Sequence, residues 1–103
     1  MDNMQYIDVV LKEEKHRNEV MREAYKKRLE VLPQGSLILR ELNGKTYCYL
    51  KYREKSKVIQ KYAGTIDSEN TIREGISERK HLQNMLSMLE KEYKRILKME
   101  TIK

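Results

Sequence analysis

The stretch 43–64, "NGKTYCYLKYREKSKVIQKYAG", decides the fold because turn signals punctuate a period-two alternation of side chains. It contains four tyrosines, five lysines and one arginine. Asn43-Gly44 suits the two-residue type I′ turn of a β-hairpin, and Lys55-Ser56 marks a second turn. The pattern therefore predicts a three-stranded antiparallel meander with strands at about 36–42, 45–53 and 58–63.

The two turns fix the strand register, and the register sorts the side chains onto two faces. We expect Leu39 opposite Cys48, and Arg53 opposite Val58. One face is mainly apolar and should pack on helices: Leu37, Leu39, Cys48, Leu50, Tyr52, Ile59 and Ala63. The other face is aromatic and polar and should meet solvent: Ile38, Arg40, Tyr47, Tyr49, Lys51, Arg53, Gln60 and Tyr62.

Long helices are expected on both sides of the meander, at about 4–32 and about 68–99. Residues 4–32 lack Gly and Pro, and Leu32-Pro33-Gln34-Gly35 stops the first helix. The second helix begins at Asp67-Ser68-Glu69 or at a capping box from Thr71 to Glu74. Each helix has one apolar stripe: Met4, Ile7, Leu11, Met21, Tyr25 and Leu32 in the first, and Ile72, Ile76, Leu82, Leu86, Leu89, Tyr93 and Ile96 in the second.

One stripe per helix predicts an antiparallel pair. The predicted fold is α+β, a single domain over 1–103 in which the meander is inserted into a long helical hairpin. The expected register places Ile7 and Leu11 near Tyr93 and Leu89, and Tyr25 near Gly75. Polar residues that interrupt the stripes should pair across the hairpin: Glu14, Asn18, Arg79 and Gln83. The methionines Met85, Met88 and Met99 we interpret as core filling, with an adaptable protein interface as the alternative.

The net charge of +6 is concentrated in the meander. Residues 33–66 hold seven basic and two acidic side chains, a net charge of +5, whereas residues 1–32 are neutral and 67–103 carry +1. This distribution predicts an anionic partner. The candidate contacts are Arg40, Lys45, Tyr47, Tyr49, Lys51, Arg53, Lys55, Lys57, Lys61 and Tyr62. Cations would neutralise phosphates and tyrosines would stack on bases, although our register points Lys61 to the apolar face. The alternative is that tyrosine simply favours strands and that lysines protect sheet edges from aggregation.

The central motif also resembles a known family. Leu32-Pro33-x-Gly35-Ser36, Gly44-Lys45-x-Tyr47-x-Tyr49-Leu50-x-Tyr52-Arg53-Glu54 and Lys57-Val58 with Lys61-Tyr62-x-Gly64 are similar to a family of small uncharacterised proteins of bacteria, their phages and mobile elements. The resemblance implies a helix, sheet, helix layout and no assigned activity. The meander is similar in architecture to the three-stranded DNA-binding domain of tyrosine-recombinase integrases, but no recombinase catalytic motif is present.

Other chemistries find little support in the sequence. Asn43-Gly44-Lys45-Thr46 imitates a P-loop end, but Leu39 stands where the first glycine should be. His16 and His81 sit in charged helical runs without ligand spacing, and Cys48 is the only cysteine. We therefore expect no enzyme activity, no metal and no cofactor. Without an apolar stretch long enough for a membrane span, the expected location is the cytoplasm.

Two functions remain open. The first is a non-enzymatic binding protein, of phage or mobile-element origin, whose sheet face binds DNA or RNA. The second is an inhibitor of a host defence nuclease, of the anti-CRISPR type, that occupies a nucleic-acid groove or a protein surface. A homodimer formed through the helices is possible in both cases.

Overall fold

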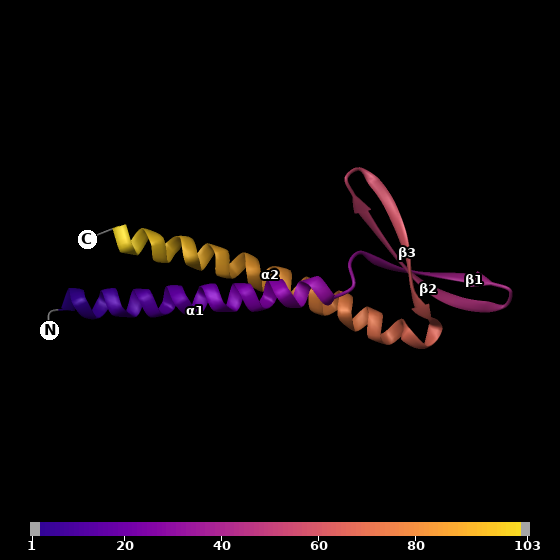
Figure 1. The fold of residues 1–103 in the computed structure, drawn as a ribbon, viewed down its shortest axis with the longest axis horizontal. Helices are drawn as coiled ribbons and strands as arrows, with labels where there is room; N and C mark the ends of the chain where they lie inside the picture. Colours follow the sequence, from indigo (N-terminus) through magenta and orange to yellow (C-terminus); the bar gives the residue numbers. More distant parts are fainter. Residues whose placement is uncertain (1–2, 102–103) are drawn as a thin grey trace. The chain divides into compact units, whose positions relative to one another are not determined.

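The computed structural model describes the backbone of residues 3–101 and the side chains of residues 6–101. Its elements are helix α1 (Asn3–Val31), strands β1 (Ser36–Leu42), β2 (Lys45–Glu54) and β3 (Lys57–Thr65), the 3-10 helix η1 (Ile66–Ser68) and helix α2 (Glu69–Thr101) (Figure 1). The strands form one antiparallel sheet in the order β1-β2-β3. The α+β class and the order of elements predicted from the sequence are confirmed.

The chain divides into two compact units. Among the described residues, the helix-pair unit comprises 3–30 and 82–101, and the sheet unit comprises 31–81. Each unit has its own buried side chains: Asn18, Leu82, Leu89 and Ile96 in the first, and Leu32, Cys48 and Ile72 in the second. Ile7, expected in the core, is instead 53% exposed, as are Met88 at 62% and Met99 at 57%, so core filling is the wrong role for those two methionines. The side chain of Met4 lies outside the described residues.

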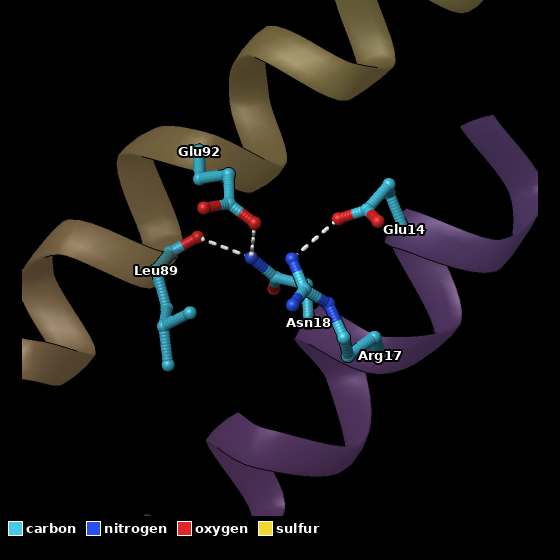
Figure 2. Close-up of polar contacts among 5 residues, drawn as sticks. All are labelled: Glu14, Arg17, Asn18, Leu89 and Glu92. Atoms are coloured by element: carbon cyan, nitrogen blue, oxygen red, sulfur yellow. Dashed lines mark hydrogen bonds and ion pairs between the residues drawn. The ribbon is translucent and has the colours of Figure 1, made fainter. Parts of the chain in front are cut away.

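Asn18 is the buried polar centre of the helix-pair unit, with only 1% of its surface exposed (Figure 2). Its Nδ2 donates to the Leu89 carbonyl oxygen at 2.8 Å and to Glu92 Oε1 at 3.4 Å. Its Oδ1 accepts a hydrogen bond of 2.7 Å from Arg22 Nε. Both ends of the amide are therefore satisfied, as burial of a polar group requires.

The register of the helix pair differs from the one expected. Leu89 was expected near Leu11, but it contacts Asn18, seven residues further along α1. Tyr93 was expected near Ile7, but its hydroxyl donates to Glu19 Oε1 at 3.0 Å. Relative to the expected register, the Leu89 contact is displaced by seven residues along α1 and the Tyr93 hydroxyl contact by twelve. Leu82, Leu89 and Ile96 of the α2 stripe are nevertheless buried. The buried amide of Asn18 supports the observed register, because there its Nδ2 donates to Leu89 and Glu92 of α2.

The end of α1 is fixed within the sheet unit. Pro33 ends the helix two residues after Val31, and Arg79 Nη1 donates to the Leu32 carbonyl oxygen at 3.2 Å. A Cβ built on Gly75 would lie 2.6 Å from ring carbons of Pro33. The Pro33 ring thus fills the space that we expected Tyr25 to occupy. Arg79, expected to pair across the helical hairpin, reaches the residue that follows the end of α1.

The predicted strand register is confirmed. Leu39 lies opposite Cys48, and Arg53 lies opposite Val58. One feature of the pairing between β2 and β3 differs from the prediction. Tyr49 pairs with Tyr62 but Cys48 pairs with Gly64, so Ala63 is an extra, unpaired residue on β3. This β-bulge and the three further residues of β3 were not foreseen. The helix that follows η1 begins at Glu69, which confirms the first of the two expected start signals.

Two glycines differ in the space around them although both have positive φ. Gly35 has φ 91°, and a Cβ there would lie 2.3 Å from the Lys51 carbonyl oxygen, so the chain can pass over β2 only without a side chain. Gly44 has φ 77° in the β1–β2 turn, and a Cβ there would meet nothing within 4 Å. Gly35 therefore combines backbone and packing constraints, whereas Gly44 has only the first.

This contrast gives a first prediction. Gly44→Ala should lower the free energy of unfolding by about 1–2 kcal/mol through the left-handed backbone alone. Gly35→Ala should lower it by about 3 kcal/mol or more, because it adds a clash with the Lys51 backbone. Urea denaturation of the full chain measures both values. Equal losses would show that β2 is not where the structure places it.

A second prediction concerns Asn18. Asn18→Ala should lower the free energy of unfolding by about 1–3 kcal/mol, because Arg22 and Glu92 lose a partner inside the helix pair. The exposed Asn84 on α2 provides the control, and Asn84→Ala should change the same quantity by less than about 0.5 kcal/mol. If the two substitutions had the same small effect in thermal and urea unfolding, Asn18 would not be the buried centre of the pair.

Candidate functional site

The solvent-facing side of the sheet holds what we call the tyrosine-basic face, defined as Arg40, Tyr47, Tyr49, Lys51, Arg53, Gln60 and Tyr62. β2 is the central strand, so its odd-numbered side chains from Tyr47 to Arg53 lie on one face. Residues directly opposite them share that face: Arg40 faces Tyr47, Tyr62 faces Tyr49 and Gln60 faces Lys51. The predicted sorting of these residues is confirmed by the pairing.

Three tyrosine rings form a cluster on this face. The Tyr62 ring centroid lies 5.6 Å from that of Tyr49, in an edge-on arrangement at 72°, and 6.2 Å from that of Tyr47, tilted by 58°. Such separations are typical of favourable aromatic pairs. Tyr62 remains 53% exposed, while Tyr47 and Tyr49 are half-buried. Tyr62 therefore offers an exposed ring held in place by two others.

Arg40 crosses the sheet from β1. Its Cζ lies 5.2 Å from the centroid of the Tyr49 ring, within the range of a cation–π contact. Its Nη2 donates to Gln60 Oε1 on β3. A guanidinium has five N–H donors in a rigid fork, so Arg40 carries further donors besides the one that Gln60 accepts. The ring and the amide orient the cation without neutralising its charge.

The other candidate cations fall into two groups. Lys51 and Arg53 are exposed on the tyrosine-basic face, and Lys45 begins β2 on the same side. Lys55 lies in the β2–β3 turn with φ 46°. Lys57 and Lys61 point to the opposite face, because they pair with Glu54 and Leu50. The structure thus places eight of the ten candidate residues on the tyrosine-basic face or in the turns beside it. The other two, Lys57 and Lys61, lie on the opposite face.

The opposite face is partly buried. Cys48 is fully buried, and its Sγ donates to the Thr65 carbonyl oxygen at 3.4 Å. Leu37, Leu50 and Tyr52 are half-buried, but Leu39 on the edge strand β1 is 45% exposed. This face is therefore apolar as expected, with its edge open to solvent.

Gln60 is the contributor that sequence reasoning missed. It was assigned to the correct face but not to the site, because a neutral amide contributes nothing to a charge count. The only signal was positional: Gln60 lies opposite Lys51 on β3, where a long side chain from β1 can reach it across β2.

Metal and membrane features were searched over the described residues. Among them, no group of three or more His, Cys, Asp or Glu side chains could hold a metal ion. His16 and His81 are both exposed on helices. No helix between residues 3 and 101 is both long and apolar enough to cross a membrane.

Comparisons with known proteins add no relative. The chain matches no protein-family model, and neither a curated protein nor a solved structure matches it significantly. The likenesses to a mobile-element family and to integrase DNA-binding domains stay predictions.

Proposed function

We propose that the protein is a non-enzymatic nucleic-acid-binding protein that uses the tyrosine-basic face. The observation that carries the proposal is the position of Arg40, whose guanidinium lies over Tyr49 and is held by a neutral amide. An arginine oriented in this way keeps its full charge for a phosphate. Forming a bidentate contact then costs less side-chain entropy, because the rotamer is already selected.

The surrounding side chains fit a phosphate backbone. Lys51 and Arg53 are exposed at alternate positions of β2, and Lys55 continues the series at the turn. Alternate residues of a strand are about 6.6–6.8 Å apart, which is comparable to the phosphate spacing of an extended single strand. Cations at this spacing would release counterions from successive phosphates, which is the main source of non-specific affinity.

The ring cluster fits the bases. The Tyr62 ring is exposed and braced by Tyr47 and Tyr49, so a base can stack on it without first ordering a mobile side chain. Stacking of bases on aromatic rings beside a basic strand is the usual recognition mode for single strands. We therefore favour a single strand over a duplex as the ligand.

The resemblance of the central motif adds a phage or mobile-element origin to the proposal, and a single cysteine is compatible with a reducing cytoplasm. An inhibitor of a host defence nuclease would use the same basic face against a protein. The proposal commits to nucleic acid, and the experiments below distinguish the two.

The first binding experiment compares polymers. Fluorescence anisotropy with single-stranded DNA, single-stranded RNA and duplex DNA should show the strongest binding for the single strands. The affinity for them should fall linearly with the logarithm of salt concentration, with a slope of about −0.7 for each phosphate contacted. Absence of binding to all three polymers at low salt would contradict the proposal and favour a protein target.

The second experiment separates the two faces at equal net charge. The variant Lys51→Gln/Arg53→Gln should weaken single-strand binding by about tenfold or more and lower the salt slope by about 1–2. The control Lys57→Gln/Lys61→Gln removes two cations from the same hairpin, but from the opposite face. It should change the affinity by less than about threefold, because only long-range attraction is lost.

Equal losses for the two variants would show that binding depends on net charge and not on the face. Circular dichroism of both variants controls for folding. All four side chains are exposed, so neither pair of substitutions should unfold the sheet.

A further inference from the structure

The two helices of the helix-pair unit carry polar contacts on one side of their line of contact. Lys15 Nζ lies 3.6 Å from Glu100 Oε1, and Arg22 Cζ lies 4.3 Å from the centroid of the Tyr93 ring. The Tyr93 hydroxyl donates to Glu19 on the same side. On this side, polar contacts join the two helices.

The other side carries exposed apolar residues from both helices. Successive residues of an α-helix are rotated by about 100° around the helix axis. Viewed along α1 from Asn18, Arg22 is therefore rotated in one direction, and Val10 and Ala24 are rotated by about 80–120° in the other. On α2 the same holds around Leu89: Tyr93 is rotated in one direction, and Met88 and Met99 are rotated by about 80–100° in the other. Because the helices are antiparallel, these offsets place all four residues on the same side of the pair. We call it the apolar side, and it also includes Tyr6 and Met85.

The exposure of this side is high for an isolated helix pair. Tyr6 is 65% exposed, Met88 62% and Met99 57%, although methionine is among the residues most often buried and tyrosine is intermediate. A groove of about 300 Å³ opens on α2 and is lined by Met85, Met88, Leu89, Lys91, Glu92 and Arg95. The apolar side thus has both the composition and the relief of an unfilled packing surface.

A belt of charges divides the apolar side into two blocks. Glu14 Oε2 and Arg17 Nη2 form an ion pair of 2.5 Å on α1, and Glu92 lies across from them on α2 with Asn18 between (Figure 2). Arg95 follows Glu92 by three residues. Tyr6, Val10 and Met99 lie beyond one edge of the belt, and Ala24, Met85 and Met88 lie beyond the other.

The order of charges in this belt is self-complementary. On each helix an acidic residue precedes a basic one by three positions. When two identical helices lie antiparallel, the acidic position of one faces the basic position of the other, whereas parallel packing would bring like charges together. In the same antiparallel arrangement, the block with Tyr6, Val10 and Met99 of one copy would face the block with Ala24, Met85 and Met88 of the other.

From this symmetry we infer that the apolar side binds the apolar side of a second copy of this chain, giving a four-helix arrangement in which Glu14 of each copy pairs with Arg17 of the other. The inference uses only the helix-pair unit and is independent of the proposed nucleic-acid binding. Dimerisation would give each assembly two tyrosine-basic faces and raise its avidity for long strands.

Sedimentation velocity of the full chain over a range of micromolar concentrations tests the inference. The wild type should form a dimer. Met88→Glu should weaken dimerisation by about tenfold or more, because it buries a charge in an apolar block. The matched control Leu97→Glu introduces the same charge at an exposed apolar residue of α2 on the other side of the pair, and should leave the dimer intact.

Charge exchange gives a sharper version of the test. Glu14→Arg alone and Arg17→Glu alone should each weaken the homodimer, since each places like charges in the belt. A mixture of the two variants should recover dimers, because every pair across the interface again joins opposite charges. A wild type that stays monomeric, equal effects of Met88→Glu and Leu97→Glu, or no recovery in the mixture would each overturn the inference.

Discussion

The molecule depends on the pairing of β2 along both of its edges. A strand paired on two sides can direct its side chains only to the two faces of the sheet, so the sequence from Tyr47 to Arg53 is divided residue by residue. Cys48 and Leu50 turn to the apolar face, and Tyr47, Tyr49 and Lys51 turn to solvent. A slip of one residue would bury the cations and expose the cysteine, which is why two short turns and the close passage of Gly35 over β2 matter so much.

Charge is handled differently in the two parts of the chain. On the helices, Glu14 pairs with Arg17, Glu69 with Arg73, and Lys15 with Glu100. On the sheet, Arg40 instead binds a neutral amide and a ring, so its charge is positioned but not cancelled. This difference explains how a chain with nearly neutral helices can still present a strongly basic surface. It also separates self-association, which we assign to the helices, from ligand binding, which we assign to the sheet.

Much of the fold could be predicted because its signals are local. Asn43-Gly44 fixes one turn through backbone conformation, Pro33 ends α1, and the alternation in β2 assigns the faces. The register of the helix pair could not be predicted, because apolar stripes of 3-4 spacing can face each other in more than one register along the helices. The choice rests on the long-range contact of Asn18 with Leu89, which has no sequence signature. The bulge at Ala63 and the contact of Arg40 with Gln60 were missed for the same reason, since each depends on a neighbouring strand.

The tyrosine rings allow the most direct measurement of the central claim. The chain has seven tyrosines and no tryptophan or phenylalanine, so ring resonances from selectively labelled tyrosine are few and assignable by substitution. Titration with a short single-stranded oligonucleotide should shift the rings of Tyr47, Tyr49 and Tyr62. The ring resonances of Tyr52, which lies on the same strand but on the opposite face, should not shift, and neither should those of Tyr93 on α2. If Tyr52 shifted as far as Tyr49, or if none of the three face rings responded while the strand bound, the tyrosine-basic face would not be the binding surface.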